Sequence, residues 1–213
     1  MSDVLVQISN AVIEGRVKDI QGLTNTALGE GLTAKDVLDN GLMPGMDEVG
    51  TQFKKGKKFV PEMLLSARTM QRSLDILKPL LVKAGAKMMG KAVIGTVKGD
   101  LHDIGKNLVG MMLEGSGFEV VDLGKDVPPE KFVDAVKAQK PDVVGMSALL
   151  TTTMRAMGHT ITMLKEAGLR DSVKIMVGGA PVTPDFAKQI GADAYASNAP
   201  AAADLAKKFV GAA

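Results

Sequence analysis

Hydrophobic residues in the first 83 positions recur at helical spacing, and this part of the sequence carries no strand signal. Val4, Ile8 and Val12 follow Ser2, a residue type that often caps helices, and they predict an amphipathic helix over 2–15. Further helices are expected over 16–28, from Thr33 onward, over 46–53 and over 61–82. Because short connections favour antiparallel neighbours, we expect a small all-α bundle.

Glycine, proline and lysine mark the turns of this bundle. Residues 41–45, Gly-Leu-Met-Pro-Gly, are expected to interrupt the helical pattern. Pro61 suits the first turn of a helix, and an apolar stripe that continues to Leu81 makes this the longest helix expected. Four lysines within 54–58 form a basic turn, which we interpret as a solvated loop.

In the second part of the chain, short apolar runs alternate with helical stretches. Strands are expected over 91–97, 119–123, 143–148, 174–177 and 192–196. Helices are expected over 104–115, 129–139, 154–167, 184–190 and 200–209. Parallel strands need crossover helices, and nearly continuous apolar strands are typical of sheets covered on both faces. The expected fold is therefore an N-terminal helical bundle followed by a doubly wound, parallel five-stranded α/β sheet of Rossmann or flavodoxin-like type.

Small residues between the two patterns indicate a domain boundary. Residues 84–90, Ala-Gly-Ala-Lys-Met-Met-Gly, have the composition of a short flexible linker. We therefore expect a bundle domain over 1–83 and an α/β domain over 91–213.

Composition narrows the partners and the chemistry. The 26 Lys and Arg residues nearly balance the 24 Asp and Glu residues, so the net charge of +2 gives no reason to expect nucleic acid or a membrane as a partner. The absence of cysteine excludes disulfides and thiolate metal sites, and it is compatible with a reducing compartment. With neither a signal-peptide pattern nor an apolar run of 18 residues, we expect a cytoplasmic protein.

Three of the loops that follow strands carry residues suited to chemistry. In a doubly wound sheet these loops share the edge at the carboxyl ends of the strands, where ligands bind. His102 lies in the first loop, and imidazole is a common metal ligand whose second nitrogen is often tuned by a carboxylate, here Asp100. Capping or packing of the loop is the alternative for a lone histidine. Bulky and charged residues in this loop exclude the G-x-G-x-x-G fingerprint of dinucleotide binding.

The other two loops offer hydroxyls and glycines. Ser147, Thr151 and Thr153 follow the third strand and can bind a buried polar ligand, although such residues also cap helices. Gly178 and Gly179 follow the fourth strand, where they allow a ligand or another backbone to come close, or simply form a turn.

Together the three loops match one pattern: Asp-x-His-x-x-Gly, then Ser-x-Leu, then Gly-Gly. This pattern resembles the cobalamin-binding signature. The matching residues are Asp100, His102, Gly105, Ser147, Leu149, Gly178 and Gly179. The bundle that precedes this domain extends the resemblance over nearly the whole chain. In this order of domains the chain is similar to the cobalamin-binding region of methionine synthase and to the corrinoid methyl-carrier proteins of methyltransferase systems.

The resemblance implies a relay of three residues below the cofactor. Cobalamin or a related corrinoid is held with its dimethylbenzimidazole tail detached from cobalt, and His102 takes the lower axial position, an arrangement called base-off/His-on. Asp100 accepts a hydrogen bond from the His102 ring. Thr153 continues the relay with a hydroxyl where relatives commonly have serine, and the relay links cobalt coordination to proton uptake.

The same resemblance places the remaining residues around the cofactor. Gly105 leaves clearance for the corrin at the start of the following helix. The hydroxyls and glycines of the other two loops surround the buried nucleotide tail and its phosphate. The cofactor-binding residues implied beyond the relay and Gly105 are Asp103, Ile104, Ser147, Leu149, Thr151, Gly178 and Gly179.

By resemblance, the function expected is that of a methyl carrier, with methylcobalamin as an intermediate form. A substrate-specific methyltransferase loads the methyl group, and a second methyltransferase with a folate or thiol acceptor removes it. A reductive activation protein is a further expected partner, and the chain is not expected to be catalytic alone. The bundle then covers the upper corrin face, with Phe59, Met63 and Leu64 as candidates, and moves about residues 84–90. The alternative for these three side chains is bundle core.

Three other interpretations stay open at this point. A regulatory module that senses adenosylcobalamin has a similar domain order, but the chain lacks tryptophan and an additional basic domain. A cobalamin subunit of a carbon-skeleton mutase typically lacks the preceding bundle. A flavodoxin-like domain without a cofactor leaves the three loop motifs unexplained.

Overall fold

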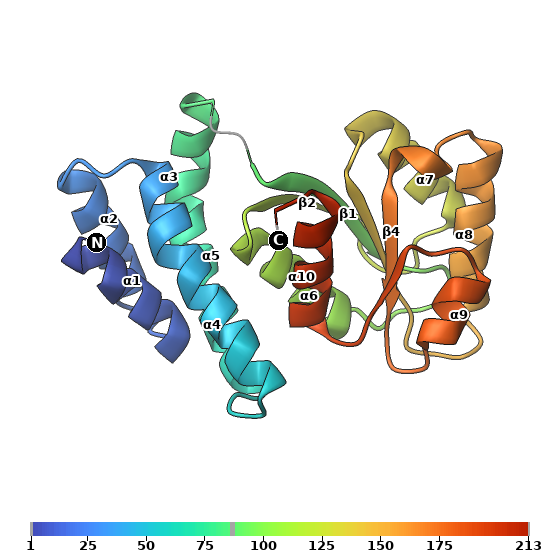
Figure 1. Ribbon diagram of the computed structural model, residues 1–213, viewed down its shortest axis with the longest axis horizontal. Coiled ribbons are helices and arrows are strands. Elements are labelled where there is room, and N and C mark those ends of the chain that lie inside the picture. Colours follow the sequence, from blue (N-terminus) through green and yellow to red (C-terminus); the bar gives the residue numbers. More distant parts are fainter. Residues whose placement is uncertain (1, 86–87, 213) are drawn as a thin grey trace. The chain divides into compact units, whose positions relative to one another are not determined.

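The computed structural model describes residues 2–85 and 88–212, and these form two compact units (Figure 1). The first unit takes the chain up to Met88 together with Gly115–Gly117, and the second takes Met89–Glu114 and the chain from Phe118 onward. The linker expected at 84–90 includes residues 86 and 87, which lie outside the described residues. Each unit is described by itself.

The first unit is a bundle of helices around an aliphatic core. Its elements are α1 (Asp3–Glu14), α2 (Ile20–Gly29), α3 (Ala34–Val37), the π-helical turn η1 (Leu38–Leu42), α4 (Met43–Lys54) and α5 (Val60–Lys83). Gly15 ends α1 in a left-handed conformation, with φ of 70°. The side chains of Ile8, Ile20, Met46 and Leu77 are fully buried between the helices, which confirms the helical bundle expected from the pattern.

The break expected at residues 41–45 is wrong. The chain stays helical from α3 through η1 into α4, and Pro44 lies in the first turn of α4, directly after the π-helical turn. The glycines serve packing instead. A Cβ on Gly41 would lie 3.0 Å from Cγ2 of Ile8, and one on Gly45 would lie 2.8 Å from the carbonyl oxygen of Ser9. Close approach of two helices, which sequence periodicity does not register, therefore explains both glycines.

Helix α5 is the longest helix described, as expected. The three side chains proposed as a cap lie at its start or directly before it, and they differ in burial. Met63 is buried among the bundle helices, which supports the alternative that it belongs to the core. Phe59 is 64% exposed and Leu64 37% exposed. These two side chains are therefore available to an external partner or ligand, whereas Met63 is not.

The second unit is a five-stranded parallel sheet with the order β2-β1-β3-β4-β5. Its strands are β1 (Gly90–Thr96), β2 (Phe118–Asp122), β3 (Val143–Ser147), β4 (Lys174–Gly178) and β5 (Ala194–Ala196). Its helices are α6 (Ile104–Gly115), α7 (Pro129–Gln139), α8 (Arg155–Glu166), the 3-10 turn η2 (Arg170–Ser172), α9 (Pro184–Gln189) and α10 (Ala199–Phe209). The order and the parallel pairing confirm the doubly wound, flavodoxin-like fold.

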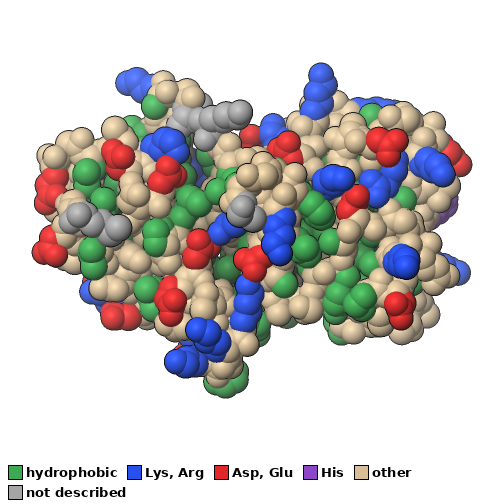
Figure 2. Space-filling view, in the orientation of Figure 1, with side chains coloured by type: hydrophobic (Ala, Val, Ile, Leu, Met, Phe, Trp, Pro, Cys, Tyr) green, Lys and Arg blue, Asp and Glu red, His purple; other side chains and the backbone are tan. Residues whose placement is uncertain are grey.

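Two apolar clusters lie on the two faces of this sheet. Helices α7, α8 and α9 pack on one face around Phe132 and Met157. Helix α10 and the end of α6 pack on the other, around Leu113 and Phe118 (Figure 1). Because both faces are covered, the strands are apolar along nearly their whole length. Charged side chains of both signs are mixed over the visible surface, in keeping with the small net charge (Figure 2).

Strand β5 is shorter than the run expected at 192–196. The carboxylate of Asp193 accepts a hydrogen bond from the backbone N–H of Ile175 at 2.7 Å, and its own N–H donates to the Ile175 carbonyl at 2.8 Å. A side chain thus takes the place of a backbone acceptor, and regular pairing begins at Ala194.

Candidate functional site

The strand order reverses between β1 and β3, and the loops that follow these two strands lie side by side. Thr96 at the end of β1 is in register with Ser147 at the end of β3, and the N–H of Val97 donates to the Ser147 carbonyl at 3.0 Å. Open α/β sheets bind ligands at such a switch point. Asp100 and His102 therefore meet the 148–153 segment, as the strand-end argument predicts.

The Asp100 carboxylate joins the two loops. Its Oδ1 accepts hydrogen bonds from the backbone N–H of His102 at 3.0 Å and from the His102 ring at 2.8 Å. Its Oδ2 accepts from the backbone N–H groups of Leu149 at 2.7 Å and Leu150 at 3.2 Å, and from the Thr153 hydroxyl at 2.8 Å. The carboxylate is fully buried, so these five donors replace its water shell.

The hydrogen bonds decide the charge state of Asp100. Burial raises the pKa of the carboxyl. The hydrogen bonds from His102, Leu149 and Thr153 lower the pKa by more than burial raises it, so it lies well below its usual range. Asp100 is therefore an anion at neutral pH. A buried anion at hydrogen-bond distance fixes the tautomer of a histidine, because it favours a proton on the facing nitrogen.

The imidazole of His102 is held by Asp100 at the surface of the loop. Its ring donates from Nδ1 to the ionised Asp100, and the side chain is 52% exposed. The tautomer that this bond favours leaves the lone pair of Nε2 available, which is the form of imidazole that binds metals. The same bonds also order the loop, so the geometry is compatible with both a ligand role and a structural role for His102.

Thr153 contacts the carboxylate that the resemblance assigns to it. Its hydroxyl lies 2.8 Å from Asp100 Oδ2 and also 2.8 Å from the carbonyl oxygen of Leu150. One hydroxyl proton serves one acceptor at a time, so Thr153 can donate to Asp100 or turn away from it. Helix α8 has Met154 before its first residue and no side-chain cap, so Thr153 does not act as a helix cap.

Four exposed apolar side chains lie in the two loops that carry His102 and the partners of Asp100. Two of them, Leu101 and Leu150, were not predicted from the sequence. Leu101 and Ile104 flank the histidine and are 60% and 70% exposed. Leu149 and Leu150, whose N–H groups hold Asp100, also expose much of their side chains. We call Leu101, Ile104, Leu149 and Leu150 the apolar rim. Large aliphatic side chains left this exposed together indicate a binding surface.

The three glycines of the motif differ in what surrounds them. A Cβ on Gly105 would meet nothing within 4 Å, so the fold itself does not require glycine there. By contrast, a Cβ on Gly179 would lie 1.9 Å from the Ala148 carbonyl oxygen, and one on Gly178 would lie 2.8 Å from that of Ala196. Packing of the chain thus explains Gly178 and Gly179, whereas it does not explain Gly105.

The remaining predicted residues lie around the same edge. Asp103 precedes α6, and its carbonyl accepts the N–H of Asn107 at 2.8 Å. Ser147 ends β3, and Thr151 is exposed in the turn that follows. Within residues 2–85 and 88–212, the hydroxyls of Ser147 and Thr151 make no hydrogen bond, so both remain available to a polar ligand.

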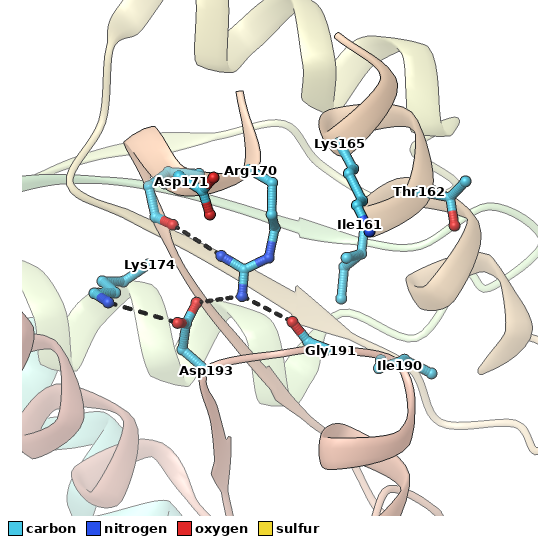
Figure 3. A pocket seen from close by; sticks show the side chains of 10 residues that line it. Ile161, Thr162, Lys165, Arg170, Asp171, Lys174, Ile190, Gly191 and Asp193 are labelled. Atoms are coloured by element: carbon cyan, nitrogen blue, oxygen red, sulfur yellow. Dashed lines mark hydrogen bonds and ion pairs between the residues drawn. The ribbon is translucent and has the colours of Figure 1, made fainter. Parts of the chain in front are cut away.

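A hollow lies at the opposite edge of the sheet, where β4 and β5 begin (Figure 3). It lies between α8, η2 and the segment before β5, and it has a volume of about 480 Å³. The guanidinium of Arg170 donates hydrogen bonds to Asp193 at 2.9 Å and to the carbonyls of Gly191 and Val173 (Figure 3). Arg170 therefore joins the segments that precede β4 and β5 at the amino ends of the strands.

The described residues contain no group of three or more His, Asp or Glu side chains that could hold a metal ion on its own. In the described part of the chain, no helix has both the length and the hydropathy needed to cross a membrane.

A parallel sheet with a carboxylate-supported imidazole at its switch point defines a cofactor-binding α/β protein. Residues 90–204 match the B12 binding domain family, and residues 4–78 match a second B12 binding domain family. The chain belongs to the B12-binding corrinoid proteins, and its cofactor is cobalamin or a related corrinoid.

Relatives of known type agree over the full length. The chain is 42% identical to the dimethylamine corrinoid protein of Methanosarcina barkeri over 209 residues, which cover 98% of both chains. A cobalamin-binding protein of Desulfitobacterium hafniense DCB-2 is 34% identical, with a TM-score of 0.80 over 96% of this chain and 98% of that one. The methanol:cobalamin methyltransferase complex MtaBC of M. barkeri contains a chain that is 33% identical, with a TM-score of 0.87 over 100% of this chain and 81% of that one. These relatives favour the methyl-carrier interpretation over the sensor and mutase alternatives.

Proposed function

We propose that this protein carries a methyl group on its corrinoid between two methyltransferases. One is specific for a small methylated substrate, and the other transfers the group to a folate or thiol acceptor. The observation that carries the proposal is the Asp100–His102 pair, which presents a half-exposed imidazole within the apolar rim at the edge of the sheet. Full-length similarity to methylamine corrinoid proteins and to a chain of the MtaBC complex supports the two-partner scheme.

The residues present fit a corrinoid. His102 offers an Nε2 lone pair to cobalt, the apolar rim suits the flat ring, and the open space at Gly105 leaves room for its edge. The unbonded hydroxyls of Ser147 and Thr151 suit the polar groups of the nucleotide tail, beside Leu149. When bound in this way, the corrinoid supplies a cobalt atom that can accept and release a methyl group.

The chain itself tunes that cobalt through a proton. Because the pKa of Asp100 is low, its carboxylate is ionised where it faces Nδ1 of His102. The ionised carboxylate favours a proton on Nδ1 and leaves Nε2 as the atom that can bind either a proton or cobalt. Protonation and ligation therefore compete for one atom. Thr153 modulates this competition, because its hydroxyl stabilises the Asp100 anion only while it donates to Oδ2.

Spectroscopy of the reconstituted full chain tests this function. The protein is loaded with cobalamin that carries ¹⁵N in its benzimidazole and is reduced to the Co(II) state. We expect hyperfine coupling to unlabelled nitrogen, since a protein imidazole replaces the tail, and we expect His102→Ala to lose that coupling while it retains some cofactor. Coupling to labelled nitrogen in the wild type would contradict the axial assignment, and a folded chain that takes up no cobamide would overturn the function.

The partners are tested separately with the loaded protein. We expect a methyltransferase of the methylamine or methanol type to methylate it, and we expect a second methyltransferase to demethylate it with a thiol or folate acceptor. The absorption spectrum of the corrinoid reports both steps. His159→Ala is the matched control for His102→Ala, because His159 is an exposed histidine on α8 and is not one of the motif residues.

A further inference from the structure

The loop between β2 and α7, residues 123–128, forms hydrogen bonds with the backbone of Gly99 and Asp100. The Asp126 carboxylate accepts a hydrogen bond from the N–H of Gly99 at 2.7 Å. The N–H of Asp126 donates to the Asp100 carbonyl oxygen at 3.0 Å. The side chain and the backbone of one residue thus fix the segment that carries the His102 acceptor.

This contact is kept at the cost of backbone strain. Asp126 has a φ of 53°, and among the described residues only Lys140, at the end of α7, shares a positive φ without being glycine. Gly99, which donates to Asp126, has a φ of 83°. Strained conformations of this kind persist where the surroundings enforce them, and they concentrate at functional sites. Aspartate and asparagine are among the side chains that tolerate this region.

A second contact holds the other side of His102. Lys106 in the first turn of α6 is buried, and its Nζ forms an ion pair with Asp122 Oδ2 at the end of β2. Asp122 Oδ1 accepts the N–H of Gly124 at 2.8 Å, and the Gly124 carbonyl accepts the N–H of Thr96 at 2.9 Å. A lysine is unfavourable near the positive end of a helix dipole, so the stability of α6 alone does not explain it.

We propose that Asp126 and the Lys106–Asp122 pair are positioning residues for His102. They hold residues 99–106 at both ends, so that the Asp100–His102 pair keeps one orientation when His102 binds or leaves the cobalt. The inference rests on the proposed function, because it assigns these residues to the axial ligand. None of these three residues forms a hydrogen bond or ion pair with the Asp100 carboxylate or the His102 ring, and each acts through the backbone or through α6.

Asp142 provides a matched control. Its carboxylate accepts the N–H of Lys91 at 2.7 Å, which is the same kind of bond as that between Asp126 and Gly99. Lys91 lies at the start of β1, and therefore at the opposite edge of the sheet from His102. Removing either carboxylate costs one side-chain acceptor for one backbone donor, but only the first is connected to the axial ligand.

The first test uses Asp126→Gly, Asp126→Asn and Asp142→Ala in the full chain loaded with cobalamin. Glycine removes the acceptor and also the φ strain, so this variant remains folded while the contact is lost. We expect Asp126→Gly to lower the ratio of His-on to His-off Co(II), read by EPR, by about two- to tenfold, the effect of one hydrogen bond. Asp126→Asn, which keeps an acceptor and tolerates the conformation, restores most of the ratio. Asp142→Ala leaves it at the wild-type value.

The second test needs no cofactor. Amide hydrogen exchange at Gly99 in the apo chain is expected to speed up about two- to tenfold in Asp126→Gly and to stay unchanged in Asp142→Ala. For the second contact, Lys106→Met removes the buried charge without leaving a buried cation unpaired, and the EPR ratio should fall as it does for Asp126→Gly.

Failure of the positioning role can be distinguished from failure of the axial ligation by His102. A wild-type His-on ratio in both Asp126→Gly and Lys106→Met, or unchanged exchange at Gly99, would overturn the positioning role while the axial ligation stands. Benzimidazole coordination in the unmutated protein would instead overturn the axial ligation. An equal fall of the ratio in Asp142→Ala and Asp126→Gly would show a general loss of stability and would also reject the positioning role.

Discussion

At the scale of single residues, the site depends on the Asp100 carboxylate, which is buried and accepts five hydrogen bonds. Asp100→Asn places an amide N–H₂ against donors that need an acceptor. We expect the apo protein to lose about 2–4 kcal/mol of unfolding free energy, since donors to a charged acceptor are left unsatisfied. Urea unfolding measures this loss. Asp103→Asn, three positions along the same loop, is the control and should change the value by less than about 0.5 kcal/mol.

The same carboxylate predicts a pH dependence. Its pKa is lowered from an ordinary value of 3.8, so folding favours the ionised form. The resulting stability is fully present above about pH 4 and is lost as the pH falls below it through the pKa of the folded state. The difference in unfolding free energy between the wild type and Asp100→Asn should therefore be constant from pH 5 to 7 and shrink below pH 4. A difference that is independent of pH would contradict the ionised assignment.

Two glycines of the motif should respond in opposite ways to one substitution. Gly105→Ala places a methyl group in open space near the start of α6, so we expect equal stability or a gain of up to about 1 kcal/mol in the apo protein. Corrinoid affinity should fall, because the methyl group occupies space that we assign to the ring. Gly179→Ala meets the Ala148 carbonyl in a backbone with φ of 123°, and we expect a loss of about 3 kcal/mol or more. Chemical unfolding and cobalamin titration separate the two effects, and unchanged affinity in Gly105→Ala would reject its assigned role.

At the scale of elements, the hydrophobic periodicity of the sequence predicted the helices and strands and their arrangement. The alternation of apolar runs with helices led to the parallel sheet, because strands covered on both faces must be apolar. The pairing of Asp100 with His102 was predictable because both lie in one loop at a strand end. The N–H groups of Leu149 and Leu150 were not, because every residue carries this group and only the fold aims it at Asp100.

Tertiary contacts explain the elements that were missed. Gly41 and Gly45 were interpreted as a break in the helical pattern. The chain instead stays helical there, and both glycines let α1 pack close to this segment. The role of Asp126 depends on a left-handed backbone and on a partner 27 positions away, and no local pattern signals either one.

The helix contact at Gly45 gives a prediction at this scale. Gly45→Ala sets a Cβ 2.8 Å from the Ser9 carbonyl oxygen and 3.0 Å from Cβ of Val12, so α1 and α4 must separate. We expect a loss of about 1–3 kcal/mol despite the better helix propensity of alanine. Gly22→Ala, in α2 with nothing within 4 Å, should gain about 0.5–1 kcal/mol instead. Thermal or urea unfolding of the two variants decides, and two gains would refute the close-packing explanation.

At the scale of the whole molecule, cofactor binding and folding are linked. A ligand that binds only the folded chain stabilises it by about 2.7 kcal/mol when its concentration is 100 times the Kd. We expect hydroxocobalamin to raise the unfolding temperature of the wild type, since we propose that it covers the apolar rim and binds His102.

His102→Ala separates the two parts of this stabilisation. The variant keeps the rim and the hydroxyls of Ser147 and Thr151, so it should retain a shift, but a smaller one at the same cobalamin concentration. An equal shift in both proteins would mean that the imidazole adds nothing to binding, and no shift in the variant would mean that the rim and the tail site do not bind by themselves. A partial shift is expected because a carrier must keep its cofactor while the axial ligand changes, and that requires affinity from contacts other than the metal bond.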